Sequence, residues 1–589
     1  MQKMKRSHYC GELRLADAGQ AAKLTGWVMR RRDHGGVIFV DLRDKSGITQ
    51  VVFDPMISQV AHELANQIRN EFVLCVSGKI RGRGEGATNP NLPTGEIEIA
   101  ADQLEILNTA QTPPFLVEDD INVAEEVRLK HRYLDLRRPK MQKALLTRHK
   151  AMLACRNYMS EQGFIEVETP ILMNSTPEGA RDVLVPSRLN HGQFYALPQS
   201  PQQFKQILMM SGIDRYFQIP KCFRDEDTRA DRQLEFTQID YEMSFATQDD
   251  VIEITEGLMK RIFEEAADIP VNVPFNRMSY ADAMSRFGSD KPDTRFDMEL
   301  YNLSDLVADC DFKVFSSVVS NGGQVKGLAV PDGANQFSRR DIDELTNLVA
   351  VYQAKGLAWI KVTENGFDSG IVKFFTEETL NAIAERMKAT RGDLMLFVAD
   401  TPKVVADSLS NLRLHLGRSL DLIDHNRYDF LWVVDFPLFE WNAEEDRYEP
   451  AHHLFTAPSD DSIPLLDTDP GKAQSQHYDL VINGNEVASG SVRIHRWEIQ
   501  QKILEHLNIS PEEVKSRFGY FIEALQYGTP PHAGIAPGLD RLVMIMLGEE
   551  NIREVIAFPK TQRGACLMTG APSDVTDFQL EELSIKIDA

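Results

Sequence analysis

Two segments far apart in the chain carry the side chains whose chemistry is easiest to interpret. The first, FRDEDTRADRQLEFTQID (223–240), places charged and aromatic residues on two expected strands: Arg224, Glu226, Arg232, Phe236 and Asp240. The second, GIAPGLDRLVMIM (534–546), places Arg541 at the start of an apolar helical stretch. Guanidinium groups bind phosphates, and a guanidinium and an aromatic ring can cover the two faces of a base. The pattern therefore indicates a site for a bent nucleotide, and we interpret the chain as an ATP-using enzyme.

Length and charge limit the classes to which the protein can belong. At 589 residues the chain needs several cores, and a prior of ~150 residues per domain predicts about three or four domains. Lys+Arg total 64 against 88 Asp+Glu, a formal net charge of -24, which argues against a surface coated in basic patches. The first sixty residues depart from this balance through Arg30, Arg31, Arg32, Arg43 and Lys45. Contact with nucleic acid is therefore expected to begin there.

The cysteines and the N-terminal residues indicate the compartment. The six cysteines lie far apart, without a C-x-x-C pair or a histidine at ligand spacing, which predicts reduced thiols and no zinc site. The start MQKMKRSHYC lacks an apolar signal region, and no stretch reaches the ~18 apolar residues of a membrane span. The expected address is the cytoplasm.

The order of the segments predicts a multidomain α+β fold. Short β-rich runs from Leu24 to Leu107, interrupted by one helical segment, predict a five-stranded OB-fold barrel over residues 1–107. The proline-containing stretch NTAQTPPFLVEDD predicts a linker over 108–123. Residues 124–288 and 422–589 would form the catalytic domain. Alternating strands and helices between them predict an inserted α+β module at 289–421, which carries no part of the nucleotide pattern.

Six motifs in a fixed order carry a family resemblance. They are TPEGARD (176–182), QSPQQFKQ (199–206), the 223–240 segment, VINGNEVASGSVRIH (481–495), GTPPHAG (528–534) and GLDR (538–541). Together they resemble class II aminoacyl-tRNA synthetases, and most closely bacterial-type aspartyl-tRNA synthetases, over essentially the whole chain. The resemblance implies an antiparallel catalytic sheet flanked by helices, and an insert of the GAD type shared with an amidotransferase. Ala536 and Pro537 depart from the common form of the third motif but leave Arg541 in place.

The resemblance implies roles for the residues around ATP. Arg224 would bind the α-phosphate and Arg541 the γ-phosphate, and these are the two expected catalytic residues. The wider ATP-binding set would also include Glu226, Arg232, Phe236, Glu486, Gly538, Leu539 and Asp540. Asp479 and Glu486 match a carboxylate pair that holds Mg²⁺. Taken singly, each charged residue is more often a solvated surface group, and only their joint occurrence favours the site.

The resemblance also implies a pocket for L-aspartate. Lys205 and Arg493 correspond to the residues that bind its side-chain carboxylate, and a neutral asparagine would leave both charges without a counter-ion. The other implied substrate contacts are Glu178 and Gln202 for the ammonium group, Asp240 to orient the cations, and His452 in PAHHLF. No side-chain general base for the transfer to tRNA stands out.

On the barrel, Phe39 is predicted to stack on an anticodon base, with Arg30, Gln50 and Glu98 reading base edges nearby. Strand alternation alone is equally compatible with Phe39 in the barrel core. The pair His34 and Gly86 resembles the pair found in relatives that charge both tRNA(Asp) and tRNA(Asn). Gly86 has no side chain to reach a base edge, so discrimination at the third anticodon letter should weaken. The resulting aspartyl-tRNA(Asn) would need an amidotransferase, which gives the expected functional link.

Several alternatives stay open at this point. A discriminating enzyme would act on tRNA(Asp) alone, and an asparaginyl enzyme would share the barrel, the sheet and the ATP motifs. A non-catalytic RNA-binding relic should have lost Arg224, Arg541 or the acidic pair, all of which are present. An ATP-dependent amide-forming enzyme would have no use for the barrel. The first motif and the family precedent imply a homodimer.

Overall fold

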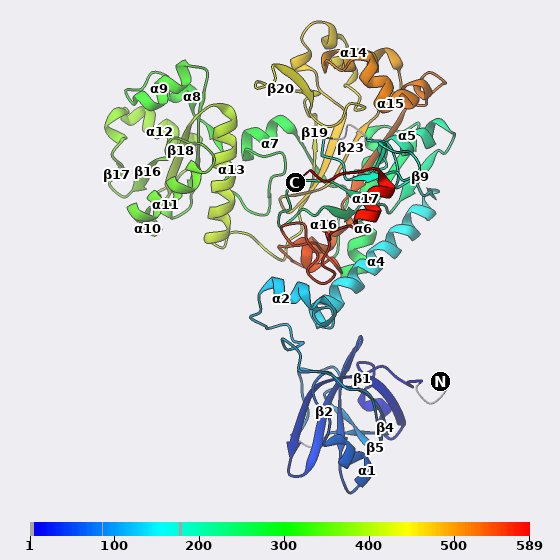
Figure 1. Cartoon of the computed structure of the whole chain (residues 1–589). Helices are drawn as coiled ribbons and strands as arrows, with labels where there is room; N and C mark the ends of the chain where they lie inside the picture. Colours follow the sequence, from blue (N-terminus) through cyan, green and yellow to red (C-terminus); the bar gives the residue numbers. More distant parts are fainter. Residues whose placement is uncertain (1–4, 85, 176–178, 589) are drawn as a thin grey trace. The chain divides into compact units, whose positions relative to one another are not determined.

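The computed structural model describes residues 5–84, 86–175 and 179–588, which divide into two compact units (Figure 1). The first unit comprises Met1–Thr147, Asp227–Arg232 and Asn551–Asp574. The second comprises Arg148–Glu226, Gln233–Glu550 and Val575–Ala589. Within the described ranges, no helix combines the length and the apolar character needed to cross a membrane.

The first unit contains a closed barrel of five strands in the order β1-β2-β3-β5-β4. Its elements are β1 (Ala21–His34), β2 (Val37–Asp44), β3 (Gly47–Phe53), α1 (Gln59–Ala65), β4 (Val73–Gly82) and β5 (Ile97–Asn108), after the short η2 (Leu15–Asp17). Alternate residues such as Leu24, Ile38, Val40 and Leu42 fill the interior and are fully buried, as the period of two in a strand requires. The predicted OB-fold barrel is confirmed.

Short helices follow the barrel in the same unit. They are α2 (Glu125–Lys130), α3 (Arg132–Asp135) and the start of α4 (Pro139–Glu161), and the C-terminal part of the unit adds η6 (Ile552–Glu554). Arg43 of the barrel forms a buried ion pair with Glu71, 3.0 Å apart, and Arg137 reaches the same carboxylate at 2.8 Å. Arg43 also donates to the carbonyl of Val117 at 3.4 Å. These contacts attach the segment after the barrel to the barrel wall.

An eight-stranded sheet forms the centre of the second unit, in the order β13-β19-β22-β23-β24-β12-β9-β6. Its strands are β6 (Ile165–Glu166), β9 (Arg215–Gln218), β12 (Asp240–Ser244), β13 (Asn276–Ser279), β19 (Phe430–Val434), β22 (His477–Ile482), β23 (Asn485–Val492) and β24 (His532–Pro537). All neighbours are antiparallel except β13 with β19 and β6 with β9. The predicted antiparallel catalytic sheet is confirmed.

Helices and small hairpins surround this sheet. They are β7 (Leu184–Pro186) with β8 (Phe194–Ala196), α5 (Gln202–Met210), β10 (Lys221–Phe223) with β11 (Glu235–Thr237), α6 (Gln248–Ala267), α7 (Tyr280–Phe287), β20 (Phe439–Asn442) with β21 (Arg447–Pro450), η4 (Asp460–Asp467), η5 (Pro470–Lys472), α14 (Trp497–His506), α15 (Pro511–Leu525), α16 (Leu539–Met546) and α17 (Asp577–Leu583). Thr247 and Asp250 start α6 with a capping box, which satisfies otherwise unpaired N–H groups of the first turn.

The inserted module has its own sheet, in the order β14-β15-β18-β16-β17 (green in Figure 1). Its elements are β14 (Tyr301–Asn302), α8 (Ser304–Val307), α9 (Lys313–Ser320), β15 (Gln324–Val330), α10 (Gly333–Gln336), α11 (Arg339–Ala350), β16 (Ala358–Thr363), β17 (Gly366–Asp368), η3 (Val372–Phe374), α12 (Glu377–Arg386), β18 (Leu394–Asp400) and α13 (Pro402–Ser419). Leu394 and Leu396 of β18 enter one core with α11 and α13, whereas Met395 and Phe397 enter another with α12. Helices therefore cover both faces of this sheet.

Candidate active site

Four buried charged side chains lie together in the second unit. Lys205, on the first turn of α5, has its Nζ 2.8 Å from Asp240 Oδ2 and 3.5 Å from Glu242 Oε2. Arg493, directly after β23, donates from Nε at 2.8 Å and from its second terminal nitrogen at 3.1 Å to the two oxygens of Glu242. None of the four is more than 1% exposed. Charges without water must be paired, and here two cations meet two carboxylates.

The predicted aspartate-binding residues Lys205, Asp240 and Arg493 are thus brought together. Glu242 was missed, although the signal was present: it is two residues from Asp240 on one strand, and such residues share a face. Burial alone would raise the pKa of Glu242, but Arg493 and Lys205 bring it below its usual range. Burial raises the pKa of Asp240, and Lys205 offsets this effect only in part. Glu242 is therefore the firmly ionised partner.

Two polar atoms of the predicted aspartate-binding residues have no hydrogen-bond partner among the described residues. They are Oδ1 of Asp240 and Nε2 of Gln202, and both side chains are buried. An unmatched buried donor or acceptor costs roughly 1–3 kcal/mol. A ligand with an ammonium group and a carboxylate could satisfy both atoms. Glu178, the other residue expected at the ammonium group, lies outside the described residues.

Three histidines border the same cluster. Arg493 lies 2.7 Å from Nε2 of His453, and because arginine can only donate, this nitrogen must accept. Burial first, and then the charge of Arg493, lower the pKa of His453 well below its usual value, so the ring is neutral. The ring of His452 stacks on that of His477, with centroids 4.1 Å apart. Sequence reasoning selected only His452 as substrate-binding, and missed the contacts of His453 and His477.

The predicted metal-binding carboxylates lie on neighbouring strands. Asp479 is on β22 and Glu486 on β23. Burial and then the charge of Asp479 raise the pKa of Glu486, and the same two causes raise that of Asp290. Mutual destabilisation of this kind is relieved by a divalent cation, and an all-oxygen donor set suits Mg²⁺. Among described residues no group of three or more ligating side chains occurs, so phosphate and water oxygens would have to complete the coordination.

Asp290 was not selected from the sequence. It lies in GSDKPDTRFDMEL, the segment assigned to the beginning of the insert. Its electrostatic link to the site is that the charge of Asp479 raises the pKa of Asp290, as it raises the pKa of Glu486.

The hairpin of β10 and β11 carries part of the expected ATP site. The guanidinium carbon of Arg224 lies 5.2 Å from the centroid of the Phe236 ring, within the range of a cation–π contact. The two residues come close because Cys222 pairs with Phe236 and Phe223 with Glu235. Glu226 follows Arg224 in the same unit, whereas Arg232 is exposed and belongs to the first unit.

The other part of the expected ATP site is the start of α16. Gly538 is the N-cap residue, and its N–H donates to the carbonyl of Val487 at 2.8 Å. Arg541 donates to the carbonyl of Glu486. Asp540 accepts from Arg148 of α4 and, at 2.7 Å, from the N–H of Thr237. Asp540 therefore connects α4, β11 and α16, and Leu539 is fully buried.

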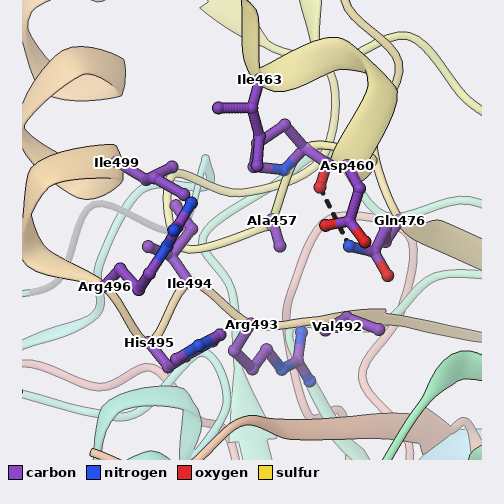
Figure 2. Close-up of a pocket in the computed structure, with 11 residues that line it drawn as sticks. Ala457, Asp460, Ile463, Gln476, Val492, Arg493, Ile494, His495, Arg496 and Ile499 are labelled. Atoms are coloured by element: carbon purple, nitrogen blue, oxygen red, sulfur yellow. Dashed lines mark hydrogen bonds between the residues drawn. The ribbon is translucent and has the colours of Figure 1, made fainter.

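A pocket of about 410 Å³ lies beside the end of β23, next to Arg493 (Figure 2). Figure 2 shows His495 and Arg496 on one side of it and Asp460 and Gln476 on the other. Of the site residues predicted from the sequence, only Arg493 lines this pocket. Its apolar walls come from Val492 and Ile494 among others, which alternate with Arg493 along the chain. The pocket is thus distinct from the carboxylate and histidine contacts of Arg493.

The barrel carries the predicted RNA-binding residues. Phe39 is half-buried and stands outside the barrel core, between the fully buried Ile38 and Val40. Gln50 donates to Glu98 at 2.8 Å, and Arg30 lies 3.5 Å from Glu118. Arg32, one of the basic residues at which nucleic-acid contact was expected to begin, pairs with Phe39 across the strands and donates to Asp41 at 2.7 Å. Phe39 is therefore available for stacking.

The two residues predicted to set tRNA choice are both exposed. His34 ends β1. Gly86 has a φ of +78°, and a Cβ at this position would meet no atom of the described residues within 4 Å. A side chain could therefore be accommodated in space, at the cost of a backbone conformation that favours glycine.

Comparison with known proteins agrees, over the whole chain, with the family resemblance found in the sequence. A family model described as class II tRNA synthetases (D, K and N) matches residues 124–562, and one described as an OB-fold nucleic acid binding domain matches residues 22–107. A protein of Heliobacterium modesticaldum named aspartate–tRNA(Asp/Asn) ligase is 56% identical, over 99% of this chain and 96% of its own. A protein of Bacillus mycoides with the same name is 54% identical, over 99% of this chain and 98% of its own.

Solved structures share the fold at low sequence identity. Asparaginyl-tRNA synthetase from Pyrococcus horikoshii, complexed with asparaginyl-adenylate, has a TM-score of 0.59 at 17% identity, and covers 94% of this chain and 98% of its own. Aspartyl-tRNA synthetase from Entamoeba histolytica has a TM-score of 0.57 at 18% identity, and covers 95% and 92%. Identity above half over the full length, together with the matching family models, shows that the chain belongs to the aspartate–tRNA ligases, which are class II aminoacyl-tRNA synthetases.

Proposed function

We propose that this chain attaches L-aspartate to tRNA(Asp) and to tRNA(Asn) through an aspartyl-adenylate, and that it works as a homodimer. The observation that carries the choice of amino acid is the buried cluster of Lys205 and Arg493 with Asp240 and Glu242. The family and the names of the relatives support the reaction.

Aspartate is preferred to asparagine because the pocket presents donors to the substrate side chain. Glu242 occupies two nitrogens of Arg493, and one bond to Asp240 leaves N–H groups of Lys205 Nζ for a substrate carboxylate. The amide nitrogen of asparagine would point its N–H groups at the N–H groups of Lys205, so donors would face donors. Sites that leave buried polar groups unmatched reject an analogue by factors on the order of 10⁴.

Activation brings a carboxylate to a triphosphate, so the site must offset repulsion between anions. Arg224 would orient the α-phosphate and Arg541 the γ-phosphate, and Phe236 would cover the adenine. Asp479 and Glu486 fit as holders of Mg²⁺, which supplies further positive charge to the phosphates when it is bound. The neutral ring of His453 keeps Arg493 in place without adding a second cation.

Relaxed tRNA choice is supported by Gly86, which offers no side chain to the third anticodon base, and by His34 at the end of β1. Phe39 would stack on an anticodon base, with Arg30, Gln50 and Glu98 beside it. The product aspartyl-tRNA(Asn) would be a substrate for an amidotransferase, a link that the family resemblance of the insert also implies.

The test combines two assays on the purified full-length protein. Pyrophosphate exchange should depend on aspartate and stay at background with asparagine, and both purified tRNAs should accept aspartate. Exchange with asparagine alone would overturn the amino-acid assignment. Charging of tRNA(Asp) without tRNA(Asn) would overturn only the dual specificity.

Variants of the anticodon region sharpen the second assay. His34→Leu combined with Gly86→Lys should reduce charging of tRNA(Asn) and preserve that of tRNA(Asp). His34→Leu with Gly86→Met is the matched control, because methionine brings similar length and the same backbone strain without a charge. An equal loss with both tRNAs would point to damage to the barrel instead.

A further inference from the structure

The loop Asp227–Arg232 belongs to the first compact unit, although the strands that precede and follow it, β10 and β11, belong to the second. Its companions in the first unit include α2, α3 and the segment Asn551–Asp574. The loop contains Arg232, which the family resemblance includes in the ATP-binding set and which, within the function proposed above, would bind the nucleotide. What holds this loop therefore bears on the reaction.

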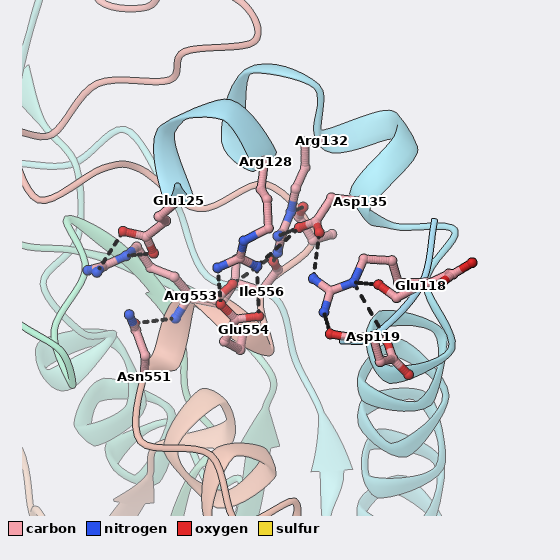
Figure 3. Close-up of polar contacts among 12 residues, drawn as sticks. Glu118, Asp119, Glu125, Arg128, Arg132, Asp135, Asn551, Arg553, Glu554 and Ile556 are labelled. Carbon is pink, nitrogen blue, oxygen red and sulfur yellow. Dashed lines mark hydrogen bonds and ion pairs between the residues drawn. The ribbon is translucent and has the colours of Figure 1, made fainter. Parts of the chain in front are cut away.

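Arg132 of α3 is bonded to three backbone carbonyls of the C-terminal segment (Figure 3). Its guanidinium donates to the carbonyls of Ala557 at 2.9 Å, Arg553 at 2.9 Å and Ile556 at 2.8 Å. It also pairs with Asp135. Arg132 is 2% exposed and Asp135 fully buried. A planar guanidinium that makes four bonds at fixed angles determines the path of the backbone it contacts.

Two more ion pairs connect the same elements. Arg128 of α2 reaches both oxygens of Glu554, at 2.8 and 3.2 Å, and Arg553 reaches both oxygens of Glu125, at 2.7 and 3.2 Å. Figure 3 shows these side chains extending between the helices and the segment. Burial would raise the pKa of Glu554, but Arg128 brings it below its usual range. The C-terminal segment is thus attached to α2 and α3 through residues 553, 554, 556 and 557.

The same segment is also hydrogen-bonded to the loop. The N–H of Ile552 donates to the carbonyl of Ala230 at 2.8 Å, and the hydroxyl of Thr228 donates to the carbonyl of Gln562. Within the loop, Arg229 and Arg232 exchange backbone hydrogen bonds at 3.3 Å in both directions. Ile552 lies next to Arg553, whose carbonyl Arg132 binds. A continuous set of bonds therefore runs from α3 through the segment to the loop.

We propose that Arg132 is a positioning residue for the 227–232 loop, and that it acts through the segment 552–562. Its hydrogen bonds run to Asp135 and to the segment, so its effect on the loop is indirect. By fixing the carbonyls of Arg553, Ile556 and Ala557, it fixes the backbone that binds Ala230 and Thr228. The consequence for ATP rests on the proposed role of Arg232, whereas the ordering of the loop does not.

The loop carries its own reporter, because Arg229 and Arg232 are exposed trypsin sites. Arg132→Lys keeps the charge but loses the planar fork. We expect trypsin to cut at these two sites at least about tenfold faster than in the parent protein, because cutting follows the population of the open loop. In tRNA-free pyrophosphate exchange, KM for ATP should rise about tenfold while KM for aspartate stays within about twofold.

Further variants separate positioning from general destabilisation. Thr228→Val, which removes only the bond to Gln562, should reproduce both effects, and Thr228→Ser should restore parent behaviour. Arg413→Lys is the matched control, because Arg413 is equally buried and also donates to three backbone carbonyls, those of Met298, Phe296 and Asp297 in the second unit. If Arg132→Lys does not fold, Arg128→Lys takes its place.

Three outcomes are informative. A lower melting temperature with unchanged loop cleavage and unchanged KM for ATP would show that Arg132 is merely structural and overturn the proposal. Faster cleavage confined to the loop, with KM for ATP unchanged, would support loop positioning but overturn the role of Arg232 in the proposed function. Faster cleavage at sites throughout the chain, equal to that at the loop, would also overturn the proposal.

Discussion

Arg493 and Glu242 form a two-point ion pair in which both side chains are buried, with nitrogen–oxygen distances of 2.8 and 3.1 Å. Glu242 thereby fixes the plane of the guanidinium. The remaining terminal nitrogen of Arg493 lies near Ser491 and His453. The orientation of Arg493, the arginine proposed to bind the substrate carboxylate, is therefore decided by a glutamate that the family motifs alone did not reveal.

Glu242→Gln should raise KM for aspartate by about a hundredfold in pyrophosphate exchange. The amide removes the negative charge and turns an N–H group toward the guanidinium, and loss of one partner of a buried pair costs about 3–5 kcal/mol. KM for ATP should change by less than about twofold. Glu299→Gln, which weakens the exposed pair with Arg286, is the control. An unchanged KM for aspartate in a folded Glu242→Gln protein would contradict this role.

Lys205→Gln should reduce kcat/KM for aspartate by a factor on the order of 10³ and reduce the preference over asparagine. The cation that favours a carboxylate is lost, and the glutamine oxygen can accept from the asparagine amide. Exchange kinetics with both amino acids measure the ratio. Lys502→Gln, at an exposed pair with Asp467, should leave the ratio as it is. Retained discrimination in Lys205→Gln would assign selectivity to other residues.

Phe39→Leu should raise KM for tRNA about tenfold while pyrophosphate exchange without tRNA stays unchanged, because stacking on a base contributes about 1–3 kcal/mol. The melting temperature should remain close to the parent value, since Phe39 lies outside the barrel core. Phe53→Leu provides the contrast: Phe53 is fully buried in that core, so its truncation should lower the melting temperature. If both changes lowered the melting temperature equally, Phe39 would have to be a residue of the barrel core, contrary to this prediction.

These residues show what the sequence could predict and what it could not. Alternation in the barrel strands is local, and it was sufficient to predict the OB fold. Lys205 and Arg493 were found through motifs, and Glu242 was within reach from its spacing to Asp240. The stacking of His452 on His477 and the bonds of Arg132 to carbonyls more than 400 residues later depend on tertiary packing. No local periodicity encodes such contacts.

His532 should make the protein less stable as the pH falls below about 6.5, the ordinary pKa of a histidine. Burial lowers the pKa of His532 to about 4 in the folded state. Between these values the unfolded chain binds a proton that the folded chain does not, so the free energy of unfolding decreases with falling pH. A difference of about 2.5 pKa units corresponds to at most about 3 kcal/mol.

Chemical denaturation of the parent protein and of His532→Asn, from pH 8 to pH 5, measures this contribution. His532→Asn should be less stable overall, because the bonds to Pro530 and Gln206 change, but its stability should fall less steeply below pH 6.5. The window from pH 8 to pH 7 is the internal control: the ring is neutral in both states there, so the two slopes should agree. Identical slopes below pH 6.5 would mean that His532 takes up its proton equally in the folded and unfolded chains, contrary to the effect of its burial.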